Sequence, residues 1–198
     1  MNEFERQREL EIERRRLILK YELEYGPDLE RRRQALLLEV EAAFGDVRKG
    51  DGIGIREAAQ HDATHTDSPE AAAAVIAARA ADIEQRWQDI PKECLAGFYE
   101  PFIWTDRKGF HFLLPAYIQY FLQCGWNCTK NSYDIHITIA IMTLGNSVSY
   151  LDEIEFTPEQ ILCIKNFIEW VVDCNNQFTG EDFVVELLDW CNTRILTG

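Results

Sequence analysis

The sequence has no long apolar run, no apolar leader and a deficit of positive charge. No stretch approaches the ~20 consecutive apolar residues that a membrane-spanning helix needs, and the first residues lack the apolar core of an export signal. Lys and Arg number 20 against 34 Asp and Glu, which gives a formal net charge of −14. Because the export signal is missing, we expect a cytoplasmic protein. Such an acidic chain repels nucleic acid and anionic membranes, so we expect it to bind neither and to prefer a basic protein partner.

The glycine-rich segment at residues 45–54 lacks the features of a nucleotide site. It has no Gly-Lys-Ser/Thr ending of a P-loop, and no predicted strand precedes it as a dinucleotide fingerprint requires. The sequence therefore predicts no cofactor.

The six cysteines fall mostly inside apolar helical patterns, at positions 94, 124, 128, 163, 174 and 191. Without an export signal we expect their thiols to be reduced and to behave as small buried hydrophobes.

What the chain does contain predicts a mainly α-helical protein. With 198 residues, 46% of them apolar, it can bury a sizeable core. The densest apolar and aromatic run is 108–126, which we expect to form a core helix with Pro115 in its first turn. Thr157-Pro158-Glu159-Gln160 predicts a capping box at the start of a helix that runs to about Cys174. A last helix is expected at 181–196.

The N-terminal region predicts a separate unit. Residues 3–25 and 29–44 have helical composition, and Gly26-Pro27-Asp28 interrupts them. A short break between two helices favours an antiparallel pair. We therefore expect an N-terminal helical hairpin at 1–44, packed on a helical core domain at 45–198. The hairpin is also a candidate for self-association.

The middle of the chain predicts short helices. One is expected at 55–60, and an alanine-rich one begins at the cap Ser68 with Pro69 and runs to about Asp89. A further short helix is expected at 92–98. The apolar isoleucines at alternate positions of 135–144 fit both a strand and a helix, and the lack of a partner strand favours the helix.

Two aromatic runs flank a polar turn before the core helix. They are Phe102-Ile103-Trp104 and Phe110-His111-Phe112. Apolar runs on both sides of a turn are compatible with one small β-hairpin inside the otherwise helical fold.

Candidate metal and catalytic groups are sparse. His61 and His65 are four residues apart beside acidic residues, but a polar turn without a third ligand favours an ordinary solvent loop. Cys124 and Cys128, with His111 and His136 as further ligands or as a base, lack recognised zinc spacing, so buried thiols are the better interpretation. Nothing in the spacing of the carboxylates at 93, 100 and 106 pairs them for acid–base catalysis. We therefore assign no catalytic or metal residue.

Candidate protein-interface residues lie in two places. The first is the charged N-terminal helix, where interleaved acids and bases indicate a solvated helix face rather than a nucleic-acid contact. The second is the aromatic region, where core packing is the first interpretation and a binding patch the second. The candidates are Glu9, Glu13, Arg14, Arg15, Arg16, Trp87 and Trp104.

Three short sequence motifs together resemble those of a family of small bacterial domains of unknown function. They are Trp87-x-x-Ile90-Pro91, then Gly109-Phe-x-Phe-x-Leu-Pro-Ala116, then Thr157-Pro-Glu-Gln160. The resemblance covers about 38–175 and leaves the charged segment 1–37 outside. It implies no catalytic residues.

These observations favour a non-catalytic protein-binding module. We expect an acidic adaptor or inhibitor, such as a toxin-neutralising immunity protein or a subunit of a bacterial defence system. The alternative is a small hydrolase that uses a metal ion or a Cys/His pair. The missing catalytic constellation and the charged N-terminal helix favour the first hypothesis.

Overall fold

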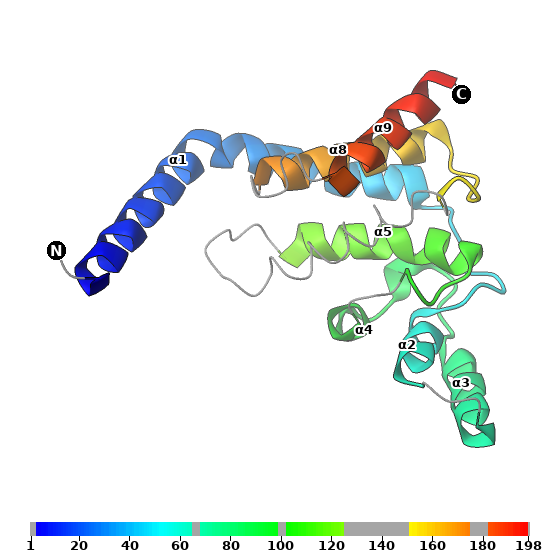
Figure 1. The fold of residues 1–198 in the computed structure, drawn as a ribbon. Helices are drawn as coiled ribbons and strands as arrows, with labels where there is room; N and C mark the ends of the chain where they lie inside the picture. The colour runs from blue at the N-terminus through cyan, green and yellow to red at the C-terminus, as the bar shows by residue number, and fades with distance from the viewer. Residues whose placement is uncertain (1–2, 65–67, 99–101, 125–150, 175–181, 198) are drawn as a thin grey trace.

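The computed structural model describes residues 3–64, 68–98, 102–124, 151–174 and 182–197 (Figure 1). These residues contain helices and no strand; one isolated antiparallel bridge joins Arg48 to Arg86. The prediction of a mainly α fold is confirmed. The small β-hairpin is not found in this part of the chain. The elements are α1 (Glu3–Phe44), α2 (Ile55–Ala63), α3 (Pro69–Ala81), the 3-10 helix η1 (Trp87–Asp89), α4 (Lys92–Gly97), α5 (Arg107–Cys124), α8 (Pro158–Cys174) and α9 (Asp182–Thr197).

The core lies between the C-terminal half of α1 and the helices α5, α8 and α9 (Figure 1). Two hydrogen bonds set α8 antiparallel to α1: Gln160 Nε2 donates to the Ala43 carbonyl at 3.1 Å, and Trp170 Nε1 donates to the Leu29 carbonyl at 3.0 Å. The core therefore joins residues on both sides of position 44. The division of the chain into domains at that position stays a prediction.

The predicted N-terminal hairpin is wrong, because α1 is one helix from Glu3 to Phe44 with Pro27 inside it. Proline removes one backbone hydrogen bond and usually kinks a helix. Figure 1 shows α1 changing direction between its two halves, with the first half projecting from the body. The antiparallel neighbour of the second half is α8, which lies more than a hundred residues later. Long-range packing of Leu29, Leu36 and Phe44 therefore keeps α1 helical through Pro27.

The core helix α5 begins at Arg107, eight residues before the predicted start at Pro115. Asp106 caps it, since Asp106 Oδ1 accepts a hydrogen bond from the Gly109 amide at 2.7 Å. Pro115 is thus inside the helix. Residues 110–112, expected in a β-hairpin, lie within its first two turns, where Phe110 and Phe112 are fully buried. Burial on several faces of α5 outweighs the one hydrogen bond that Pro115 removes.

The glycine-rich loop 45–54 packs on the start of α5. Asp106 Oδ1 also accepts a hydrogen bond from the Ile53 amide at 3.0 Å. A Cβ atom at Gly109 would lie only 2.3 Å from the Ile53 carbonyl oxygen. Glycine is therefore required at this position by close backbone approach. The loop is therefore a structural junction between the end of α1 and the start of α5.

The predicted helix caps are confirmed at two places. Ser68 Oγ accepts a hydrogen bond from the Ala71 amide at 3.1 Å, at the start of α3. At α8, the Gln160 amide donates to Thr157 Oγ1 at 3.3 Å, and the Thr157 amide donates to Gln160 Oε1 at 3.1 Å. This is the predicted capping box.

Several boundaries differ from the sequence-based expectation. The alanine-rich helix ends at Ala81 rather than near residue 89. Trp87 then turns inward, and its Nε1 donates to the Phe44 carbonyl at 2.8 Å at the C-terminal end of α1. The segment 135–144 lies outside the described residues. Among the helices that are described, none is long and apolar enough to cross a membrane.

Candidate functional site

Three features of the described chain bear on function. The first is the N-terminal extension, which we define as residues 3–28 of α1. The second is a buried polar network around Asp82. The third is a cleft between α2, α3 and α4.

The N-terminal extension buries none of its described side chains. Of the predicted interface residues, Glu13 and Arg16 are exposed. Glu9, Arg14 and Arg15 lie on the same helix, but the structure does not describe their side chains. Ile12 is a large apolar side chain that is 58% exposed. The side chains that the structure describes in this extension are therefore solvent-exposed or half-buried, and none belongs to the core.

The two predicted tryptophans lie away from the extension. Trp87 is buried and hydrogen-bonded, so it belongs to the core and not to a binding surface. Trp104 is half-buried and packs against the core, and no partner for its Nε1 is found among the described residues. Of these two residues, only Trp104 has any surface exposure.

The histidines do not form a metal site in the described part of the chain. His61 lies on α2, not in a polar turn, and its Nε2 is 3.8 Å from Glu57 Oε1. His65 lies outside the described residues. No group of three His, Cys, Asp or Glu side chains suited to a metal ion occurs within the described ranges.

The Cys–His pair considered from the sequence is not found among the described residues either. His111 Nε2 contacts Gln160 Oε1 at 3.1 Å. Because this oxygen is an acceptor, Nε2 must donate. Cys128 and His136 lie outside the described residues, as does the side chain of Cys124. The free thiols Cys163 and Cys191 are buried, and burial raises the pKa of each to about 12. Thiols of such high pKa are poor nucleophiles.

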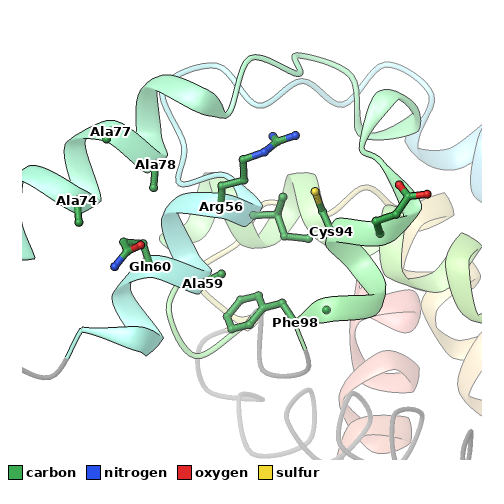
Figure 2. A pocket seen from close by; sticks show the side chains of 11 residues that line it. Arg56, Ala59, Gln60, Ala74, Ala77, Ala78, Cys94 and Phe98 are labelled. Atoms are coloured by element: carbon green, nitrogen blue, oxygen red, sulfur yellow. The ribbon is translucent and has the colours of Figure 1, made fainter.

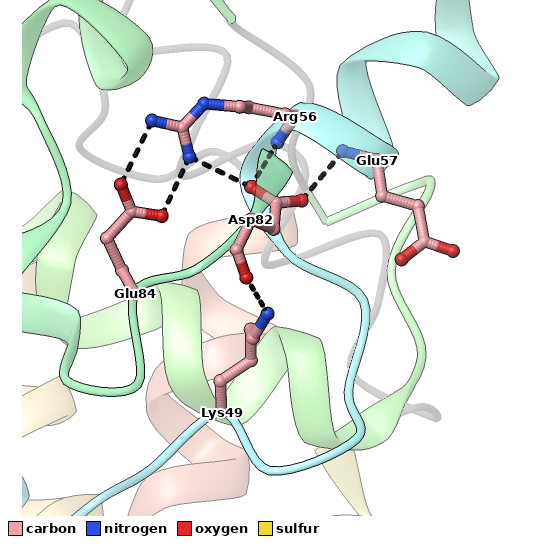
Figure 3. Close-up of polar contacts among 5 residues, drawn as sticks. All are labelled: Lys49, Arg56, Glu57, Asp82 and Glu84. Carbon is pink, nitrogen blue, oxygen red and sulfur yellow. Dashed lines mark hydrogen bonds and ion pairs between the residues drawn. The ribbon is translucent and has the colours of Figure 1, made fainter. Parts of the chain in front are cut away.

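The polar network fixes the start of α2 (Figure 3). The Asp82 carboxylate accepts hydrogen bonds from the Arg56 amide at 3.0 Å and the Glu57 amide at 2.8 Å. Asp82 thus caps α2 from a distant segment, because the N-cap residue Gly54 has no side chain to do so. A Cβ atom at Gly54 would lie 2.4 Å from Asp82 Cγ, so glycine makes room for this carboxylate. Lys49 Nζ donates to the Asp82 carbonyl.

Arg56 extends this network to Glu84. Its two terminal nitrogens lie 2.7 and 3.0 Å from the two Glu84 oxygens, a bidentate pair (Figure 3). The Glu84 carboxylate raises the pKa of the Arg56 guanidinium, and Arg56 in turn lowers the pKa of Glu84. Both groups stay ionised, and the Arg56 charge is matched inside the protein. The network therefore holds residues 82–84, and with them the end of α3, against α2.

Glu57 is buried, and only one of its two carboxylate oxygens accepts a hydrogen bond within the described residues. Its Oε1 accepts a hydrogen bond from Arg79 Nη1 at 3.2 Å, which adds a second tie between α2 and α3. Its Oε2 is buried with no hydrogen-bond partner among the described residues. Arg79, the cation of the Glu57–Arg79 pair, is half-exposed. We therefore assign this pair to the packing of α2 on α3 rather than to catalysis.

The cleft lies beside this network and has a volume of about 600 Å³ (Figure 2). Small-molecule sites in proteins usually have volumes of about 300–1,000 Å³. Figure 2 shows the alanines of α3 on one side of α2, with Cys94 and Phe98 on the other side. The lining residues are Ile55, Arg56, Ala59, Gln60, Ala74, Ala77, Ala78, Glu93, Cys94, Gly97 and Phe98.

Sequence reasoning missed both the network and the cleft. Asp82 is an unremarkable acid at the end of an alanine-rich segment, and nothing local pairs it with Gly54. The alanine spacing at 74, 77 and 78 marks one face of a helix, but it does not say whether that face is packed or open. The cleft appears only once three helices are in place.

The comparisons with known proteins place the chain in a family without assigning a function. No curated protein and no solved structure matches it. Residues 32–194 match the model of DUF6714, described as a family of unknown function. The match is wider at both ends than the expected range 38–175, and it begins just after the N-terminal extension. The chain therefore belongs to DUF6714, a family of unknown function.

Proposed function

We propose that the protein is a non-catalytic protein-binding module and that the N-terminal extension is one of its binding elements. The observation that carries the proposal is the absence of any buried side chain among those described in residues 3–28, on a helix continuous with the buried half of α1. The proposed roles are an acidic adaptor or inhibitor, such as a toxin-neutralising immunity protein or a bacterial defence-system subunit.

The length of the extension suits a helix that docks on another protein. At 1.5 Å per residue, residues 3–28 reach roughly 39 Å from the point where packing begins. Helices of this kind bind by placing an apolar stripe in the groove of a partner. Ile12 is a large apolar side chain of the extension that the body leaves 58% exposed. A partner that docks on this face of the helix would bury it.

Charge favours a basic partner. Residues 3–28 hold eight acids and six bases, a net −2, which leaves −12 of the total −14 on the rest of the chain. A body of this charge attracts a basic protein and speeds the encounter at low salt. The same charge argues against nucleic acid and anionic membranes as partners.

A test compares substitutions on the two halves of α1 in the full-length protein. The tagged protein is purified from its native host as wild type, as Ile12→Glu/Arg16→Glu, and as Leu38→Glu. Leu38 is a matched control because it is 75% exposed on the same helix but lies inside the family region. We expect a stoichiometric protein partner with wild type and Leu38→Glu, and its loss with the double variant. Retention of the partner by the double variant would contradict the role of the extension.

Metal content and mass, measured on the same samples, separate the other hypotheses. About one equivalent of zinc and no protein partner would favour the metal-dependent hydrolase. A dimer in light scattering that dissociates in Ile12→Glu/Arg16→Glu would show that the extension serves self-association instead.

A further inference from the structure

Helix α9 packs on α8 and leaves one side of its own surface to solvent. Figure 1 shows it at an edge of the molecule, and the chain ends there on the opposite side from the N-terminus. Exposed residues recur along this side at the spacing of one helical face. We define the acidic face of α9 as Asp182, Val185, Glu186, Asp189 and Leu196.

The acidic face of α9 carries three negative charges and no positive one. No ion pair of Asp182, Glu186 or Asp189 is found among the described residues. The one base in the sequence of α9 is Arg194, which lies on another side of the helix and pairs with Asp152 at 2.7 Å. The charge of this face is therefore −3 when only its own residues are counted.

Other exposed acids of the protein are neutralised within their own helix. On α1, Asp28 pairs with Arg31, and Glu30 pairs with Arg33 at 2.7 Å. On α9 the three acids follow each other at i, i+4 and i+7, so each lies about one turn from the next. Like charges at this spacing repel and destabilise a helix. Cations from another molecule would remove this repulsion.

The acidic face also offers apolar contact. Val185 is 47% exposed and lies one turn from both Asp182 and Asp189. Leu196, which is 86% exposed, continues the same side toward the end of the helix. A row of carboxylates with apolar side chains beside it is complementary to an amphipathic helix whose Lys or Arg residues flank an apolar stripe.

We propose that the acidic face of α9 docks a basic amphipathic helix of a protein partner. Lys or Arg residues spaced one turn apart on that helix pair with the three acids, and an apolar side chain between them covers Val185. The inference rests on the function proposed above, because it takes the partner to be a basic protein. It adds a second surface, which lies inside the region matched by the family model except at its end, whereas the N-terminal extension lies outside that region.

The test uses a synthetic helical peptide with Lys at positions i, i+4 and i+7 and leucines between them. Its control is a scrambled peptide of the same composition, which has the charge without the stripe. Both are titrated against the full-length protein as wild type, Glu186→Lys, Val185→Ala and Glu70→Lys. Glu70 is a matched control because it is an exposed acid on α3, so its reversal changes the net charge equally. Circular dichroism confirms that each variant is folded.

We expect the designed peptide to bind wild type about tenfold more tightly than the scrambled one, and to lose affinity as salt rises. Its affinity should fall about tenfold with Glu186→Lys and stay within about twofold with Glu70→Lys. It should also fall with Val185→Ala, which leaves the charge unchanged. Equal binding of the two peptides, or equal effects of the two charge reversals, would show unspecific attraction to an acidic protein and would overturn the proposal.

Two further outcomes separate this surface from the others. A wild-type dimer that Glu186→Lys dissociates would assign the face to a second copy of the chain and would overturn the proposal. Ile12→Glu/Arg16→Glu should bind the designed peptide as wild type does. If the peptide fails to bind while the native partner is still captured through the extension, this inference is wrong and the function proposed above stands.

Discussion

Helices α3 and α8 begin with nearly the same residues and end in opposite environments. Ser68-Pro69-Glu70 starts α3 and Thr157-Pro158-Glu159 starts α8, each with a hydroxyl cap and a proline in the first turn. Eight residues of α8 are buried, and no residue of α3 is. The local start signal thus fixes that a helix forms. It does not fix what the helix does.

The difference arises from side-chain size along each face. The inner face of α8 carries Ile164, Phe167 and Trp170, which fill the space against α1 and α9. The face of α3 toward the cleft carries alanines, which remove little apolar area from water when they pack. Helix α8 therefore stabilises the fold through its buried face, whereas α3 contributes little buried apolar area.

Removing a large side chain from each helix should give the widest contrast. Trp170→Ala deletes a side chain that is 2% exposed and frees the Leu29 carbonyl from its hydrogen bond. We expect the free energy of unfolding to fall by about 3–5 kcal/mol. Ile76→Ala in α3, where the side chain is 68% exposed, should change it by less than about 0.5 kcal/mol. Urea denaturation measures both. A loss of about 2 kcal/mol or more for Ile76→Ala would show that α3 is packed.

Helix α2 sharpens the comparison because its cap comes from the segment after α3. Asp82→Ala leaves the Arg56 and Glu57 amides without their acceptor in a buried setting. We expect a loss of about 2–3 kcal/mol in urea denaturation, because unpaired buried donors carry a full desolvation cost. Asp89→Ala, at an exposed acid in η1, is the control and should stay within about 0.5 kcal/mol. Equal effects of the two substitutions would refute the capping of α2 by Asp82.

The sequence predicts what is local and misses what is distant. The caps of α3 and α8 were predictable because Ser68 and Thr157 bond to amides three residues ahead. The predicted break at Pro27 failed because burial of Leu29 and Phe44 against other helices keeps α1 continuous. Proline propensity is a local quantity, and the packing that outweighs it is not.

The candidate sites follow the same rule. The exposed charged helix was predicted from composition, and the exposed residues Glu13 and Arg16 agree with a solvated face. The capping of α2 by Asp82 and the cleft between three helices depend on contacts between segments that are far apart in sequence. No spacing rule connects Gly54 to Asp82, so only the folded arrangement shows them.

Lowering the pH should destabilise the start of α8 and leave the start of α3 unchanged. His111 donates to Gln160 Oε1, the atom that also closes the capping box. Burial lowers the pKa of His111 below its ordinary value of 6.5, more than the Gln160 hydrogen bond raises it. Between the folded pKa and 6.5 the unfolded chain therefore binds more protons. The contribution of His111 is complete above pH 6.5 and is lost as the pH falls through this window.

The measurement is the free energy of unfolding from pH 7.5 to 5.5 for wild type and His111→Gln. This range lies above the pKa of ordinary carboxylates. One group changes stability by at most about 1.4 kcal/mol per pH unit, so the effect is smaller than that of Asp82→Ala. Glutamine has no titrating ring, and we expect the variant to lose less stability on acidification than wild type. Identical pH profiles would show that His111 stays neutral or solvated in both states.

The smallest effect, and the closest test of the comparison, comes from the two caps. Thr157→Ala and Ser68→Ala each remove one hydroxyl acceptor, a loss of about 1 kcal/mol to the helix concerned. Because α8 forms part of the core, we expect Thr157→Ala to lower the global free energy of unfolding by that amount. Helix α3 buries nothing, so Ser68→Ala should raise amide exchange within residues 69–81 and leave global stability nearly unchanged. Equal global losses would mean that α3 unfolds together with the core. In that case α3 would be stabilised by the fold itself, in spite of its exposed face.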